Sequence, residues 1–277
     1  MFEKIKGWQS SLYYLLVYIF IGGTLTFFVG SFILKLAGLN DFILARYYII
    51  KSFDLIFVLI LTFLFAGYVS KEKFSDLGLC RDSAIKNSFL GVLGGFIFIF
   101  IVFIFFWGFN YLAVQEVSLN IKGLFFAFIF WMYVAIIEEL VYRGYILNNL
   151  SKSFNKYISI VIVSILFSLV HASNPNTTIL GFINLFLFGF LVGLYYINKK
   201  SLWFPIFFHF SWNFFQGSFF GMNISGLMGF SSIIEINMIS KNKFLTGSKF
   251  GAEGSILVTV LLITFIIVMK TIFKKEK

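Results

Sequence analysis

Long apolar runs separated by short polar breaks extend along the whole chain. A helix crosses a bilayer with about 17 to 25 apolar residues. On that measure the pattern predicts spans at residues 11–36, 53–69, 88–111, 123–147, 157–172, 179–197, 202–220 and 255–273. We therefore expect about eight transmembrane helices, of which 157–172 is the shortest.

Two of the polar breaks are long enough to have a structure of their own. Residues 71–87 mix both charge signs with apolar side chains, which predicts a cytoplasmic loop with a short interfacial helix. Residues 221–254 are rich in Ser, Gly and Asn, which predicts an ordinary exposed loop on the outer side rather than a lid. Neither break resembles a domain linker, so we expect residues 1–277 to form a single integral-membrane domain.

The composition agrees with this interpretation. Hydrophobic residues make up 60% of the chain and charged residues only 12%, whereas charged residues reach about a quarter of a soluble domain. Two prolines and 42 phenylalanines suit long helices, and the alternating segments of a membrane barrel are not seen. The sequence therefore predicts an all-α polytopic membrane protein with an intramembrane polar cavity. Cys80 is the only cysteine, which excludes an intrachain disulfide and a thiolate metal site.

The net charge of +10 does not indicate nucleic-acid binding, because the basic residues stand singly or in pairs beside apolar spans. With the N-terminus in the cytoplasm, about fifteen Lys and Arg residues fall on the inner side and about seven on the outer side. This bias predicts a multi-pass protein of the cell membrane with both termini in the cytoplasm. The first span is too long for a cleaved signal peptide, so we expect a retained anchor.

One predicted span carries three ionisable side chains close together. The stretch 135–147 reads A-I-I-E-E-L-V-Y-R-G-Y-I-L. A charge at bilayer depth costs about 2.5 to 3.5 kcal/mol, so such groups usually face inward, are paired and are functional. Glu139 and Arg143 are four residues apart on one helix face, which predicts an ion pair that holds this helix in place. Glu138 lies about 100° around the helix and stays available for chemistry.

The only two histidines also fall within apolar spans. His171 ends the run F-S-L-V-H, and His209 opens H-F-S-W-N, with Asn213 one helical turn further on. At 1.5 Å per residue, Glu138, His171, His209 and Asn213 lie roughly 13, 21, 10 and 16 Å from the inner ends of their spans. We therefore expect one polar cluster in the inner half of the membrane, with His171 the least well matched in depth.

These residue types suit two kinds of hydrolytic chemistry. A carboxylate and an imidazole that share a water molecule can activate it for attack on a carbonyl, and an imidazole with a carboxamide can stabilise the oxyanion. This predicts a peptide-bond hydrolase built from Glu138, His171, His209 and Asn213. Glu138, His171 and His209 could equally hold zinc with one open position. The sequence does not separate the two mechanisms.

Other polar and small residues in the spans have simpler interpretations. Ser168 and Ser211 are flanked by bulky apolar residues rather than by a nucleophile elbow, which predicts packing hydroxyls. Gly189 and Gly193 are predicted to allow close helix approach. Asn184 either bonds a neighbouring helix or lines the cavity.

Three stretches together resemble a known family. E-E-L-V-Y-R-G at 138–144, F-S-L-V-H at 167–171 and S-L-W-F-P-I-F-F-H-F-S-W-N at 201–213 look, in that order, like the motifs of the CAAX protease and bacteriocin-processing (CPBP, Abi-like) family of intramembrane endopeptidases. F-S-D-L-G-L at 74–79 is similar to a further segment often seen there. The resemblance covers a family core of roughly residues 77–215.

The resemblance implies an eight-helix core with a cytoplasm-facing cavity, in which Glu138 and His171 activate water while His209 and Asn213 support the oxyanion. It favours a metal-free glutamate mechanism, with no required cofactor, because the chain offers no obvious fourth zinc ligand. The expected partners are the lipid bilayer and a membrane-associated peptide or protein of the prenylated or bacteriocin type. A non-catalytic membrane immunity module and a proton-coupled transporter are the alternatives. The oligomeric state is left open.

Overall fold

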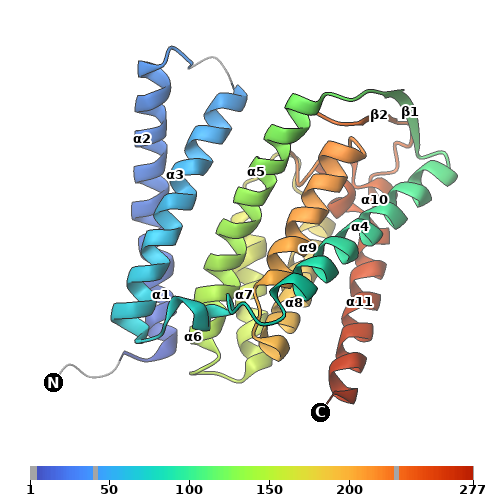
Figure 1. Ribbon diagram of the computed structural model, residues 1–277. Helices are drawn as coiled ribbons and strands as arrows, with labels where there is room; N and C mark the ends of the chain where they lie inside the picture. The colour runs from blue at the N-terminus through green and yellow to red at the C-terminus, as the bar shows by residue number, and fades with distance from the viewer. Residues whose placement is uncertain (1–4, 40–42, 228–230, 277) are drawn as a thin grey trace.

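The computed structural model describes residues 5–39, 43–227 and 231–276, and its architecture is almost entirely helical (Figure 1). Both ends of the chain lie at the same end of the helical bundle, and a two-stranded sheet lies at the other end. We call these the terminal side and the distal side. The prediction of an all-α polytopic membrane protein is confirmed.

The longer elements run alternately between the two sides. In chain order the helices are α1 (Gly7–Leu16), η1 (Val17–Gly22), α2 (Gly23–Leu36), α3 (Ile43–Leu64), η2 (Phe65–Ser70), η3 (Phe74–Leu77), α4 (Ala84–Gly108), α5 (Ile121–Glu139), η4 (Leu140–Leu147), α6 (Asn148–Leu150), α7 (Lys156–Val170), α8 (Ile179–Lys199), α9 (Trp203–Asn213), η5 (Phe214–Phe219), α10 (Lys243–Thr246), η6 (Ser248–Phe250), η7 (Ala252–Gly254) and α11 (Ile256–Lys275). Segments η1, η2, η4 and η5 are π-helical and continue an adjoining α-helix, so several of these elements form single rods.

Six of these rods within the described residues are long and apolar enough to cross a membrane: Gly7–Leu36, Ala45–Ser70, Ala84–Gly108, Ile121–Leu150, Ile179–Lys199 and Ile256–Lys275. The count of about eight is therefore not confirmed. The predicted span 157–172 corresponds to the 15-residue helix α7, and 202–220 corresponds to α9 with η5. Both shorter helices are apolar; α9 is buried inside the bundle, whereas α7 keeps one exposed apolar face.

Local sequence fixes where the helices of the family core begin. Asn120, Asn155, Thr178 and Ser255 each stand just before a helix, and their side-chain oxygens accept a hydrogen bond from a backbone N–H of its first turn. Such N-caps satisfy donors that have no partner within the helix. The caps set the starts of α5, α7, α8 and α11, and with them the depth of every polar side chain on these helices.

Close packing of small residues holds α9 against α4. A Cβ atom at Gly91 or Gly95 of α4 would lie 2.7 Å from a backbone carbonyl oxygen of α9. On the other side of the core, Cβ atoms at Gly189 and Gly193 would lie 3.2 Å from atoms of α7. The predicted packing role of these two α8 glycines is confirmed.

The distal side contains structure that the composition did not predict. Strand β1 (Leu112–Val117) pairs antiparallel with β2 (Ile234–Met238), which ties residues 221–254 to the segment before α5 (Figure 1). Residues 221–254 are not an ordinary exposed loop, because Phe250, Ala252 and Glu253 are buried against the bundle. Alternating hydrophobicity in β2 is short and lies among polar residues, so it gives little sequence signal.

Candidate active site

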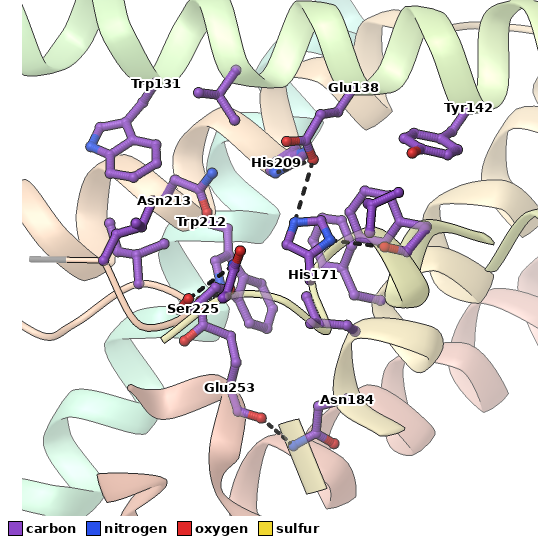
Figure 2. A pocket seen from close by; sticks show the side chains of 18 of the residues that line it. Trp131, Glu138, Tyr142, His171, Asn184, His209, Trp212, Asn213, Ser225 and Glu253 are labelled. Carbon is purple, nitrogen blue, oxygen red and sulfur yellow. Dashed lines mark hydrogen bonds and ion pairs between the residues drawn. The ribbon is translucent and has the colours of Figure 1, made fainter. Parts of the chain in front are cut away.

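A cavity of about 340 Å³ lies among α5, α7, α8 and α9, and it brings together all four residues expected to act on substrate (Figure 2). Glu138, His171, His209 and Asn213 all line it. The Nε2 atoms of His171 and His209 lie 3.8 and 3.9 Å from the same carboxylate oxygen, Oε2 of Glu138. His171 and His209 follow Glu138 by 33 and 71 positions in the chain, and both rings approach the same oxygen atom.

His171 reaches this point because α7 ends just before it. The segment after α7 contains Pro175 and turns back toward α8, with the His171 N–H donating to the Ser168 carbonyl. The ring Nδ1 of His171 lies 2.8 Å from the Phe167 carbonyl oxygen, which can only accept a hydrogen bond. Nδ1 therefore carries a proton, and Nε2 faces Glu138.

His209 is oriented in the same way by a different partner. Its Nδ1 donates to Oε1 of Glu139 at 2.9 Å, and Nη1 of Arg143 donates to the same oxygen at 2.8 Å. The predicted ion pair between Glu139 and Arg143 is confirmed. Glu139 does more than hold its helix, because it also fixes the ring of His209 so that Nε2 faces the cavity.

Arg143 is completely buried and depends on few partners. Its guanidinium contacts Glu139, lies 3.5 Å from the Gly189 carbonyl oxygen, and sits 4.4 Å from the centre of the Phe167 ring. The Nε atom has no hydrogen-bond partner among the described residues. The negative charge of Glu139 is thus the main compensation for this buried cation.

Glu138 Oε2 and the Nε2 atoms of the two histidines meet at the centre of the site. Among the described residues, Glu138 Oε2 has no hydrogen-bond donor. This carboxylate oxygen is therefore free to bind a water molecule or a cation between the two imidazole rings.

The donor set also suits a zinc ion in chemical terms, since each histidine is oriented by a hydrogen bond from Nδ1. Two ligands of a tetrahedral zinc ion lie about 3.4 Å apart, so the 3.8 and 3.9 Å separations would have to shorten slightly. Among the described residues, no group of three or more His, Cys, Asp or Glu side chains is already placed to hold a metal ion.

The serines that were considered as nucleophiles bond to backbone carbonyls instead. Ser168 donates to Ile165 at 3.0 Å and Ser211 donates to Val92 at 2.7 Å. Both are fully buried, which confirms that they are packing hydroxyls. Asn184 fulfils both of its suggested roles: it lines the cavity and bonds the start of the last helix through the Ser255 carbonyl and the Thr259 hydroxyl.

A second carboxyl group, which no sequence motif predicted, also lines the cavity. Glu253 is 4% exposed and receives hydrogen bonds from Gln216 and Ser225. Figure 2 shows Glu253 on the wall of the cavity that also contains Ser225 and Asn184. Burial raises the pKa of Glu253 to about 7. The one local hint is its position between Gly251 and Gly254, directly before an apolar span.

The fold and this site define a helical, polytopic membrane protein that holds an acid–histidine cluster in a cavity between its helices. Residues 120–215 match the family model described as type II CAAX prenyl endopeptidase Rce1-like. The match confirms the resemblance to the CAAX protease family over these residues, and it indicates a membrane protease in general terms. No curated protein and no solved structure matches the chain.

Proposed function

We propose that the protein hydrolyses a peptide bond of a membrane-associated substrate, with water activated between Glu138 and the two histidines. The convergence of both Nε2 atoms on Glu138 Oε2 is the observation that carries the proposal. A water molecule at this position would be held by a carboxylate and an imidazole, either of which can accept its proton during attack on the carbonyl.

In the proposed mechanism His209 supports the oxyanion. Its Nδ1 donates to Glu139, which fixes the ring with Nε2 toward the cavity. When Nε2 also carries a proton, its N–H can donate to the developing oxyanion, together with the carboxamide of Asn213 one turn further along α9. His171, bonded to a neutral carbonyl, is left as the partner of Glu138 in activating the water.

A zinc ion, if bound, would be held by Glu138, His171 and His209, and it would supply Lewis-acid polarisation and a more acidic bound water. On the preferred mechanism no cofactor is required.

The test is cleavage of a quenched-fluorescent library of membrane peptides by purified protein in nanodiscs. Wild type, Glu138→Gln and the control Glu235→Gln are compared, each with and without a strong chelator. Glu235 is an exposed carboxylate on β2, far from the cavity lining. We expect cleavage by wild type and the control, loss in Glu138→Gln, and no effect of the chelator. Loss of wild-type cleavage under chelator would establish the zinc mechanism.

Equal cleavage by Glu138→Gln and wild type would remove Glu138 from the mechanism. The alternative of a non-catalytic immunity or interaction module would then account better for the fold and its cavity. The transporter alternative is tested separately by substrate flux into sealed vesicles.

A further inference from the structure

A second hollow lies on the surface of the bundle, in a groove between α4 and α11. Its volume is about 430 Å³, and Leu191 of α8 and Phe208 of α9 form part of its floor. Leu90, Val268 and Ile272 line it and are 40 to 52% exposed, so the groove is open to the surface that faces lipid. None of its described lining residues lines the cavity that holds the acid–histidine cluster.

The groove exists because α4 and α11 diverge. The rings of Phe98 and Phe265 contact each other about halfway along the two helices, with their centres 5.3 Å apart. From this contact the helices separate toward the terminal side, as Figure 1 shows. Gly94 keeps the wall on α4 low, since even a Cβ atom there would lie 3.3 Å from the Phe208 ring.

The lining changes from polar to apolar with depth. Ser83, Lys86 and Asn87 stand at the start of α4, and Lys199 and Glu276 stand at the ends of α8 and α11, so all five lie at the terminal end of the groove. Deeper in the groove the lining is apolar and includes Leu90, Gly94, Leu191, Phe208, Phe265 and Met269. From Lys86 to Gly94 the helix rises about 12 Å. Half of the hydrocarbon core of a bilayer is about 15 Å thick, so the groove spans most of one leaflet.

The polar end of the groove is positively charged. Lys199 forms an ion pair with Glu276 at 2.8 Å. Lys86 is exposed, and no carboxylate among the described residues pairs with it. The further charges close to this end in sequence are Arg81, Asp82, Lys274 and Lys275. Basic groups therefore outnumber carboxylates where the groove meets the membrane surface, which suits an anionic headgroup.

We propose that this groove binds an anionic phospholipid, with an acyl chain along its apolar part and the phosphate beside Lys86. A helix from a second copy of the chain fits less well, because helix interfaces in membranes favour small residues. Gly94 is the one small residue in the apolar part of the described lining. Since Phe208 directly precedes His209, the acyl chain would pack against the helix that carries this histidine.

The test is a lipid titration of the purified full chain in detergent, followed by native mass spectrometry. Phosphatidylglycerol is compared with phosphatidylcholine that has the same acyl chains. Lys86→Gln removes the unpaired charge, and its control is Lys71→Gln, an exposed lysine on the same side that does not line the groove. Leu90→Trp fills the groove, and its control is Leu93→Trp, because Leu93 is also 40% exposed on α4 but lies outside the lining.

We expect one phosphatidylglycerol molecule per chain, bound more tightly than phosphatidylcholine. Lys86→Gln should weaken phosphatidylglycerol binding about fivefold, which is the contribution of one lysine beside an anionic lipid surface. The same variant should leave phosphatidylcholine binding unchanged. Leu90→Trp should weaken the binding of both lipids, and both controls should bind like wild type.

Equal binding of the two lipids by wild type would overturn the proposal, and so would an unchanged phosphatidylglycerol affinity in Lys86→Gln. Binding by Leu90→Trp at the wild-type level would place the lipid elsewhere on the surface. A dimer that Leu90→Trp dissociates would assign the groove to a second copy of the chain instead. None of these outcomes depends on whether the protein cleaves peptides.

Discussion

Replacing Glu139 with Gln removes the one charge that both compensates Arg143 and orients His209. The substitution keeps the size of the side chain and one acceptor oxygen. It leaves the Arg143 cation, which is 0% exposed, without a carboxylate in contact: only the introduced amide oxygen, a carbonyl oxygen at 3.5 Å and the face of Phe167 remain. Removing one partner of a buried ion pair is destabilising by about 3 to 5 kcal/mol.

The expected result for Glu139→Gln is therefore a loss of about 3 to 5 kcal/mol in the free energy of unfolding. It is measured by denaturant titration of purified protein in mixed micelles. Glu276→Gln is the matched control, because Glu276 forms an exposed ion pair with Lys199 at 2.8 Å. Loss of an exposed pair is expected to change the free energy by less than about 1 kcal/mol.

A double variant separates the two roles of Glu139. Glu139→Gln with Arg143→Met removes the uncompensated charge, so most of the lost stability should return. Peptide cleavage should not return, because Nδ1 of His209 still lacks its carboxylate partner. Recovery of cleavage together with stability would show that Glu139 has only a structural role. A single variant as stable as the Glu276→Gln control would refute the account of the buried pair.

The remaining predictions concern the distal wall and the helix packing. Because burial raises the pKa of Glu253 to about 7, its contribution to stability is complete below about pH 4.5 and is lost as the pH rises to about 7. Glu253→Gln should flatten the pH dependence of the free energy of unfolding by roughly 3 kcal/mol at most across this window, and an unchanged slope would contradict it. Gly95→Ala should destabilise by about 1 to 3 kcal/mol through overpacking against α9, measured by the same titration. Gly23→Ala is its control, since a Cβ there meets nothing within 4 Å.

The sequence predicted the parts of the site that depend on local geometry. Glu139 and Arg143 could be paired from their spacing alone, since residues four apart on a helix are neighbours. His171, His209 and Asn213 could be singled out because polar groups are expensive in lipid, wherever the helices eventually pack. These inferences use only the period of the α-helix and the apolar environment of the bilayer, and they need no knowledge of tertiary contacts.

Contacts between distant segments could not be predicted in the same way. His209 lies 70 residues from Glu139, and no periodicity relates the two. Glu253 stands in a polar segment where a carboxylate would ordinarily be solvated, so its burial depends on how that segment folds over the bundle. The end of α7 just before His171 likewise depends on the turn that contains Pro175.

The pair of adjacent glutamates shows how one helix can serve both stability and chemistry. Consecutive residues on a helix point about 100° apart, so Glu138 faces the cavity while Glu139 faces the dry interior between α5 and α9. Glu138 Oε2 is left without a donor, which suits a group that must bind water or a cation. Oε1 of Glu139 accepts hydrogen bonds from both Arg143 and His209, so this carboxylate is engaged by protein partners. The two glutamates could not exchange places. A Glu139 exposed to the cavity could not hold Arg143, and a Glu138 bound to a cation of the protein could not accept a proton from water.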